Sequence, residues 1–214
     1  KVMEEEQIRF VGLETLCAID YLHRSSILYR DLKPDNLLLD DSGHVRLVDF
    51  GVCVQGNPKE KKPPTSRDLC GTVPYMAPEL KFNQERGLPP YGAAVDWYAF
   101  GVLMYQLTED GQFPFGPDPD FEDMGAEFRQ PELIGDDGVT EVPDLYDLLS
   151  GLLDWNPKSR YGADEAGVEG LKANPYWKEP DWELLEKRRI ASPLLPLVMA
   201  RSAKRLAATS QTGP

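Results

Sequence analysis

Four polar side chains with complementary chemistry lie within residues 31–49: Asp31, Lys33, Asn36 and Asp49. An aspartate can accept a hydrogen bond from a hydroxyl group and take its proton. A lysine two residues further along an extended loop points the same way and can meet a phosphate. Amide and carboxylate oxygens are hard donors that suit Mg²⁺. Such a set can align a hydroxyl, a phosphoryl group and a metal ion, and phosphoryl transfer depends on that alignment and on charge neutralisation.

The neighbouring segments predict how these side chains are positioned. Residues 29–36 read Tyr-Arg-Asp-Leu-Lys-Pro-Asp-Asn and form a loop, whereas residues 37–39 and 45–48 are strand-like. The intervening Asp-Asp-Ser-Gly has turn chemistry, so the two strands are expected to form a hairpin. The second strand then delivers Asp49 next to the loop.

Most of the remaining sequence predicts helices. Apolar residues recur at helical spacing in residues 4–23 and 144–154, and residues 94–108 are apolar nearly all round, which indicates a buried helix. Residues 52–75 are rich in Pro, Gly and Lys and are expected to be a loop. Residues 197–214 end in small and polar residues and are expected to be disordered. The fold class is therefore α+β and mainly α-helical.

Composition excludes several classes of partner. The formal net charge of −13 argues against nucleic acid or an anionic membrane as the partner of the whole surface. No apolar run approaches the length of a membrane span. The three cysteines are odd in number, widely spaced and without metal-ligand spacing, which predicts reduced thiols and a cytoplasmic or nuclear location.

A single aspartate on a loop is usually a turn former, and Asp-Phe-Gly at 49–51 is weak evidence alone, but further motifs follow in a fixed order. They are Cys70-Gly71-Thr72, Ala77-Pro78-Glu79, Asp96-Trp97 with Gly101, and Arg160. Together these motifs resemble an AGC-group serine/threonine protein kinase, from about Glu4 to Pro196. The resemblance implies a kinase-like large C-terminal lobe over residues 1–179, with short β-hairpins around the catalytic loop. Residues 180–214 would then begin an AGC-type C-terminal tail.

The resemblance also implies the reaction and the roles of the residues that perform it. The γ-phosphate of ATP would pass to serine or threonine hydroxyls of protein substrates in intracellular signalling, with Mg²⁺ as cofactor. Asp31 would be the catalytic base, Lys33 would meet the transferring phosphate, and Asn36 and Asp49 would hold the metal. Asp35 belongs to the same nucleotide-binding loop and matches a position that holds a basic substrate residue in relatives.

Supporting residues are implied in the same way. Thr72 is expected to hydrogen-bond near Asp31 and Lys33 in the catalytic set. A buried ion pair is expected between Glu79 and Arg160. Asp96 is expected to accept backbone N–H bonds from the catalytic loop.

The activation segment differs from the AGC pattern at one position. Relatives carry a phosphothreonine two residues before the cysteine of Cys-Gly-Thr, and this chain has Asp68 there. A carboxylate carries less charge than a phosphate but could still pair with Arg30. The alternative is that Asp68 is a solvated loop residue.

Substrate preference stays open at this level. Gln106 and Pro74 stand where acids would hold a basic substrate residue. Residues 109–147 hold thirteen acids against one base, Arg129, and could attract basic peptides by their field, or could simply form a solvated acidic loop.

The expected small lobe, with a Gly-rich loop over the phosphates, would precede residue 4 and is not in this sequence. The alternatives are therefore an active kinase lobe, a catalytically silent scaffold, and a fragment without independent function.

Overall fold

A computed structural model describes residues 3–80, 89–115 and 142–210, and side chains within these ranges up to residue 204. The helices are α1 (Glu5–Arg24), α3 (Ala94–Thr108), α4 (Pro143–Leu152), α5 (Gly167–Lys172), α6 (Trp182–Glu186) and α7 (Leu195–Ser210). Short 3₁₀ turns are η1 (Pro34–Asn36), η2 (Pro58–Glu60), η3 (Val73–Tyr75) and η4 (Pro175–Trp177). The strands are β1 (Ile27–Leu28), β2 (Leu37–Leu39), β3 (Val45–Leu47) and β4 (Val54–Gln55). This mixed, mainly helical fold confirms the predicted fold class.

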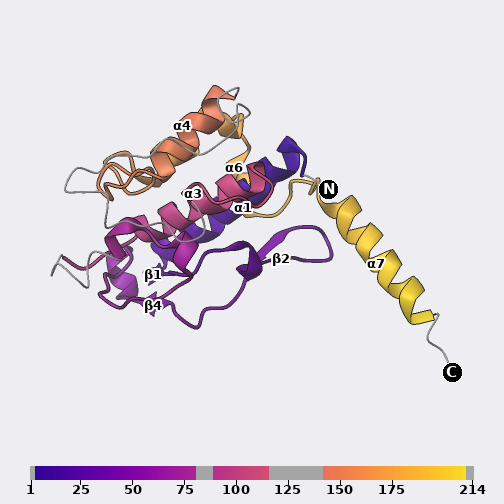
Figure 1. Cartoon of the computed structure of the whole chain (residues 1–214), viewed down its shortest axis with the longest axis horizontal. Helices are drawn as coiled ribbons and strands as arrows, with labels where there is room; N and C mark the ends of the chain where they lie inside the picture. Colours follow the sequence, from indigo (N-terminus) through magenta and orange to yellow (C-terminus); the bar gives the residue numbers. More distant parts are fainter. Residues whose placement is uncertain (1–2, 81–88, 116–141, 211–214) are drawn as a thin grey trace.

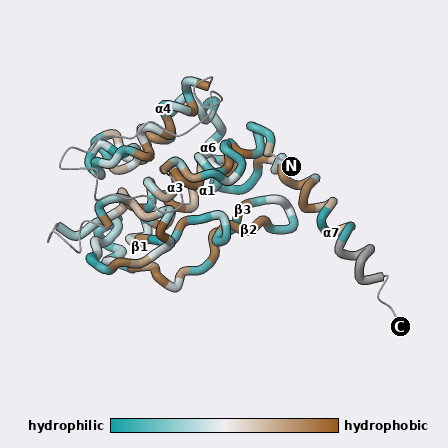
Figure 2. The backbone as a smooth tube through the Cα atoms, viewed as in Figure 1, coloured by the Kyte–Doolittle hydropathy of each residue, from teal (hydrophilic) through white to brown (hydrophobic). Residues whose placement is uncertain are grey.

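Helix α3 forms the centre of the molecule, with α1 and α4 packed against it (Figure 1). Its side chains are buried on every side from Ala94 to Gln106, as its apolar sequence predicts. A Cβ atom on Gly101 would lie 2.8 Å from the Cβ of Leu152, so glycine permits the close approach of α3 and α4. Figure 2 shows hydrophobic segments concentrated along these packed helices.

Two pairs of antiparallel strands flank the predicted catalytic loop, residues 29–36. β2 pairs with β3 in the register Leu37↔Leu47, and β1 pairs with β4, which lies beyond Asp49 in sequence. The turn between β2 and β3 is closed by Asp40, whose carboxylate accepts hydrogen bonds from the backbone N–H groups of Ser42 and His44. The predicted hairpin is therefore present, and β3 packs against α1.

The C-terminal part first packs on the body and then leaves it. Asp181 caps α6, Leu185 is buried, and Ser192 donates a hydrogen bond to the Gly43 carbonyl oxygen at the hairpin turn. The boundary between a lobe ending at residue 179 and a tail stays a prediction.

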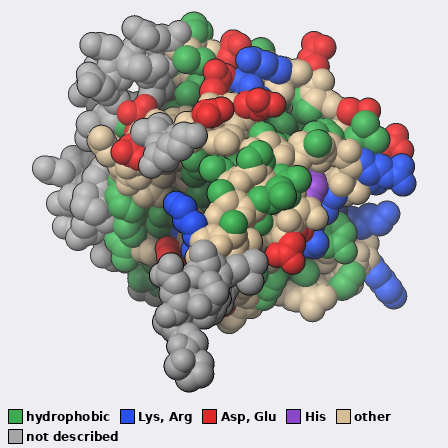
Figure 3. Space-filling view, turned by 90° about the vertical axis from the view of Figure 1, so that its right-hand side faces the viewer, with side chains coloured by type: hydrophobic (Ala, Val, Ile, Leu, Met, Phe, Trp, Pro, Cys, Tyr) green, Lys and Arg blue, Asp and Glu red, His purple; other side chains and the backbone are tan. Residues whose placement is uncertain are grey.

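Helix α7 then projects away from the other elements (Figure 1). Disorder was expected from residue 197, whereas the structure has a helix as far as Ser210. This stretch is rich in Leu, Ala, Met, Arg and Lys, which are strong helix formers. Residues 211–214 lie outside the described part of the chain. Figure 3, which views the side from which α7 projects, shows hydrophobic surface with acidic and basic side chains interspersed around it.

Candidate functional site

Asp31 lies at the centre of a hydrogen-bond network on the loop between β1 and η1. Its Oδ1 accepts a hydrogen bond from the Thr72 hydroxyl (2.7 Å). Its Oδ2 accepts from Lys33 Nζ (2.9 Å) and from the Asn36 amide nitrogen (3.1 Å). Lys33 Nζ also donates to Thr72 Oγ1 (2.8 Å), which confirms the expected contacts of Thr72. Three side chains from two separate segments thus hold the Asp31 carboxylate in a fixed orientation.

The environment of Asp31 keeps it ionised. Partial burial would raise its pKa, but the hydrogen bonds from Lys33 and Thr72 and the lysine's positive charge outweigh burial, and the pKa is lowered below its usual value. At neutral pH Asp31 is therefore a carboxylate, which can accept a hydrogen bond from a hydroxyl group. Its position beside a lysine ammonium places negative and positive charge within 2.9 Å.

The β2–β3 hairpin brings Asn36 next to the segment that ends at Asp49. Asn36 is buried and directly precedes β2, and its carbonyl oxygen accepts a hydrogen bond from Val48 N (3.0 Å). The next residue, Asp49, is exposed and has a left-handed backbone with φ of 58°. Its Oδ1 accepts from Gly51 N (3.1 Å). The backbone bond thus places Val48, the residue before Asp49, beside Asn36.

Asp96, near the start of α3, holds the backbone that leads into the site. Its Oδ2 accepts from Tyr29 N (2.9 Å), and its Oδ1 accepts from Arg30 N (2.7 Å), which confirms the expected backbone contacts. His23 Nε2 lies 2.8 Å from the same Asp96 Oδ2. Sequence reasoning missed His23, because a single histidine at a helix end carries no pattern of its own. Arg30 has φ of 73°, so these bonds stabilise a backbone conformation unusual for a side chain of this size.

The Cys-Gly-Thr turn approaches the catalytic loop closely enough to require glycine. Gly71 has φ of 105°, and a Cβ atom there would lie 2.5 Å from the Arg30 carbonyl oxygen. This close approach is what lets the next residue, Thr72, reach Asp31. The motif therefore positions a hydroxyl rather than supplying a nucleophile of its own.

Glu79 and Arg160 form the expected buried ion pair. The distances are 2.6 Å from Arg160 Nη1 to Glu79 Oε1 and 3.0 Å from Nη2 to Oε2, a bidentate arrangement. Arg160 is fully buried, and it also donates to the carbonyl oxygens of Asp154 and Ala94 at 2.8 Å each. Its guanidinium lies over the Tyr98 ring, 5.1 Å from the centroid. The pair joins the end of the segment that follows Asp49 to the region after α4.

Asp68 meets Arg30 only at the edge of hydrogen-bond distance. Arg30 Nη1 lies 3.5 Å from Asp68 Oδ2, and the Asp68 side chain is 76% exposed. The same nitrogen donates to Ser66 Oγ and Tyr91 Oη at 3.0 Å each. The two expectations for Asp68, pairing and solvation, thus both describe part of its environment, whereas Ser66 and Tyr91 were not predicted at all.

Three of the residues expected to influence substrate choice lie in the described part of the chain. Asp35 is exposed on η1. Gln106 is buried and already engaged: its side-chain oxygen accepts from the Tyr75 hydroxyl (2.5 Å), and its nitrogen donates to the Gly111 carbonyl oxygen (3.1 Å). Pro74 lies within η3. Most of the acidic stretch 109–147, including Arg129, falls outside the described residues.

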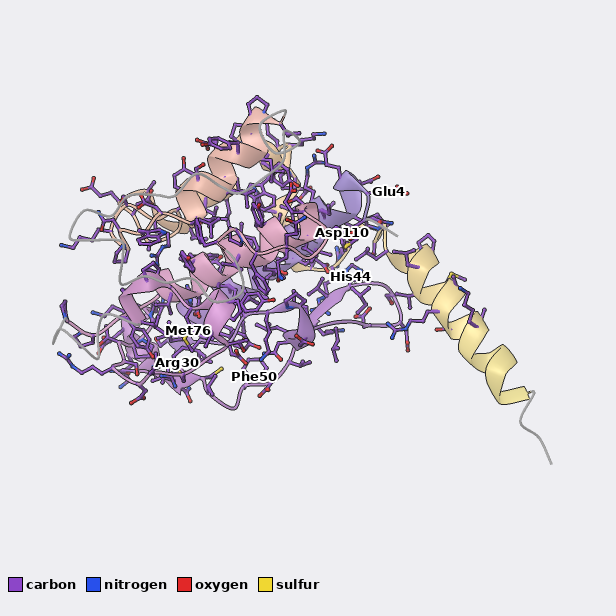
Figure 4. The ribbon with its side chains drawn as sticks, viewed as in Figure 1. Glu4, Arg30, His44, Phe50, Met76 and Asp110 are labelled. Carbon is purple, nitrogen blue, oxygen red and sulfur yellow. The ribbon has the colours of Figure 1, made fainter. Side chains whose placement is uncertain are left out.

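An exposed apolar surface adjoins the polar cluster. Leu38 on β2 is 53% exposed and Phe50 is 51% exposed, although the Phe50 ring packs edge-on against Tyr29. In Figure 4, Arg30 and Met76 lie below α3, with Phe50 nearby on the same side of the molecule. A pattern of three adjacent leucines after Asn36 could have indicated this surface. Among the described residues, no cluster of three His, Cys, Asp or Glu side chains could hold a metal alone.

Comparison with known proteins gives consistent results. The protein kinase domain family matches residues 1–169. Protein kinase C-like 1B of Caenorhabditis elegans is 36% identical over 203 residues, which cover 92% of this chain and 27% of that protein. Protein kinase C zeta type of Oryctolagus cuniculus is also 36% identical over 203 residues, 92% of this chain and 32% of that protein. Ribosomal protein S6 kinase alpha-3 of Mus musculus is 37% identical over 196 residues, 90% of this chain and 24% of that protein. The chain thus spans about a quarter to a third of the length of these relatives.

Proposed function

Because the chain belongs to the protein kinase family, and within it to the AGC group of its relatives, we propose that it carries the phosphoryl-transfer site of a serine/threonine protein kinase. The proposed substrates are ATP and serine or threonine hydroxyls of proteins in intracellular signalling. The observation that carries this proposal is the orientation of Asp31 by Thr72, Lys33 and Asn36.

The side chains divide the chemistry among them. The ionised Asp31 accepts a hydrogen bond from the substrate hydroxyl and orients its oxygen for attack. It takes up the proton as that oxygen bonds to the γ-phosphorus and the bond from the phosphorus to the bridging oxygen breaks, releasing ADP. Lys33, fixed beside Asp31, offers positive charge to the phosphate oxygens. Thr72 keeps the carboxylate from rotating, so that little reorganisation is needed during the reaction.

The residues present suit a magnesium ion. Asn36 uses its amide nitrogen in bonds to Asp31, so its amide oxygen is the donor that would meet the metal. Asp49 would add an exposed carboxylate. Two protein oxygens are few, but Mg²⁺ usually keeps water and phosphate oxygens as its other ligands. Bound Mg²⁺ would neutralise the phosphate charge. The exposed Leu38 would offer an apolar surface to the base of the nucleotide.

Partners and location follow from the same proposal. A protein substrate with a basic residue could use Asp35, and the acidic stretch could attract basic peptides. All three cysteines are free, which supports a reducing compartment, the cytoplasm or alternatively the nucleus. None of the described helices has the length and apolar character needed to cross a membrane.

A catalytically silent scaffold is the second candidate. The exposure of Asp49, Phe50 and Leu38 on the described surface favours it, since such a face can also bind a protein. The intact Asp31 network argues for catalysis, because a scaffold has no need of an oriented carboxylate.

The test is transfer of ³²P from ATP to serine/threonine and tyrosine peptide libraries by the full-length natural protein, with Mg²⁺ or with EDTA. Mg²⁺-dependent labelling of serine or threonine peptides is expected. Specific nucleotide-independent protein binding without any transfer would favour the scaffold.

A further inference from the structure

Arg30 is the point at which the catalytic loop and the segment after Asp49 meet. Its side chain is only 7% exposed, and each described contact ends on that segment or on Tyr91. Nε donates to the Val52 carbonyl oxygen (2.7 Å), and Nη1 donates to Ser66 Oγ and Tyr91 Oη (3.0 Å each). The hydrogen bonds to Tyr91 and Asp68 raise the Arg30 pKa despite burial, which acts the other way. The arginine is thus a fixed cation with two hydroxyl acceptors.

Tyr91 connects to the same segment in three further ways. Its hydroxyl donates to the Asp68 carbonyl oxygen (2.6 Å). Its backbone N–H and C=O exchange hydrogen bonds with Ser66, both at 3.0 Å. The residue is 4% exposed, and burial raises the pKa of its phenol, so the hydroxyl keeps the proton that it donates. Tyr91 therefore accepts from Arg30 and donates to the segment at once.

The Asp68 carboxylate contributes less to holding this segment on Arg30 than the hydroxyls of Ser66 and Tyr91 do. Asp68 Oδ2 is 3.5 Å from Arg30 and largely in water, where an ion pair is worth little. Its nearer partner is Ser66, whose hydroxyl donates to Asp68 Oδ2 at 3.1 Å. Ser66 Oγ also accepts from Asp68 N at 3.2 Å. Ser66 is therefore the intermediary between the arginine and the carboxylate.

We propose that Ser66 and Tyr91 are positioning residues that hold the activation segment on Arg30 through neutral hydroxyls, so that order in this segment does not depend on a charge at position 68. The consequence for catalysis, which rests on the proposed kinase function, follows from the chain path. The segment continues through Gly71, packed on the Arg30 carbonyl oxygen, to Thr72, which orients Asp31. Loosening residues 66–68 should therefore misplace Thr72.

Hydrogen exchange measured by mass spectrometry on the full-length protein tests the structural part. Tyr91→Phe removes one hydroxyl, and Ser66→Ala removes another. Each should speed exchange in peptides covering residues 64–72 by at least roughly three- to tenfold, the range for losing one hydrogen bond, because each hydroxyl makes more than one. Asp68→Ala should change it less than twofold.

Two variants serve as controls. Tyr105→Phe removes another buried tyrosine hydroxyl, which has no hydrogen-bond partner among the described residues, and should leave exchange in 64–72 unchanged. Ser66→Thr keeps the hydroxyl and should restore wild-type exchange. Wild-type exchange in both Tyr91→Phe and Ser66→Ala, or a larger effect of Asp68→Ala, would overturn the proposal.

Steady-state kinetics on the full-length protein test the catalytic part. Tyr91→Phe and Ser66→Ala should lower kcat several-fold while the KM for ATP stays constant, because Thr72 and Asp31 act on the hydroxyl of the protein substrate. Ser66→Thr should keep wild-type kcat. A change in the KM for ATP alone would count against positioning. A wild-type protein without transferase activity would refute the proposed function, whereas the exchange experiment would still decide the role of Ser66 and Tyr91.

Discussion

At the scale of single residues, the site centres on the Asp31 carboxylate, and both of its oxygens accept hydrogen bonds from neighbouring side chains. Thr72 bonds one oxygen, and Lys33 and Asn36 bond the other. Asp31→Asn should preserve the shape of the loop but remove the proton acceptor. We expect kcat of the full-length protein to fall by roughly 10²–10⁴-fold, the usual contribution of a general base, with nucleotide affinity nearly unchanged. Asp41→Asn, on the exposed hairpin turn, is the matched control. Wild-type turnover in Asp31→Asn would show that another group takes the proton.

Asp49 and Asn36 offer oxygens of different charge to a metal. Asp49→Ala should weaken Mg²⁺-dependent nucleotide binding more than Asn36→Ala does, because only the carboxylate offsets charge between metal and phosphate. The measurement is calorimetric titration of the full-length protein with ATP, with and without Mg²⁺. Because Asn36 also bonds Asp31, its variant should in addition lower kcat. Equal and negligible effects on binding would remove both residues from the metal site.

At the scale of elements, the fold depends on polar anchors between segments that are far apart in sequence. The Glu79–Arg160 pair is one of the buried anchors in the described part of the chain, and its arginine is completely inaccessible. Glu79→Ala would leave a buried cation uncompensated, and we expect the free energy of unfolding to fall by about 3–5 kcal/mol in urea denaturation. Lys187→Ala, which breaks the exposed pair with Glu183 on α6, should cost less than about 0.5 kcal/mol. Similar costs for the two variants would mean that the pair is not desolvated in solution.

The family resemblance predicted the contacts of Thr72, Glu79, Asp96 and Arg160, because each of these residues has a fixed place in the order of the motifs. The hydroxyls of Ser66 and Tyr91 were not predictable in this way. Tyr91 lies 61 residues from Arg30, and a tyrosine that bonds across such a separation leaves no local signal. Helix α7 was missed for the opposite reason: the small residues at its end were given more weight than the helix propensity of its beginning. Tertiary hydrogen bonds and competing local preferences account for both failures.

At the scale of the whole molecule, several side chains of the described site face solvent. Asp49, Phe50 and Leu38 are all substantially exposed. Affinity for a small ligand comes from convergent, buried contacts, and this chain offers a nucleotide contacts on one side. The 214-residue chain alone should therefore bind Mg²⁺-ATP only weakly, at about millimolar concentrations or above, in equilibrium dialysis or calorimetry. The full-length protein is the comparison, and micromolar binding by the chain alone would contradict this expectation.

Helix α7 gives the structure an elongated outline (Figure 1). Its 16 residues measure about 24 Å along the axis, whereas a compact domain of this length has a radius of gyration of about 17 Å. A helix of that length, attached at one end, adds long interatomic distances but little mass. Small-angle X-ray scattering should therefore give a pair-distance distribution with an extended tail. Truncation after Leu194 should remove the tail and shorten the maximum dimension, whereas an unchanged curve would mean that the arm folds back in solution.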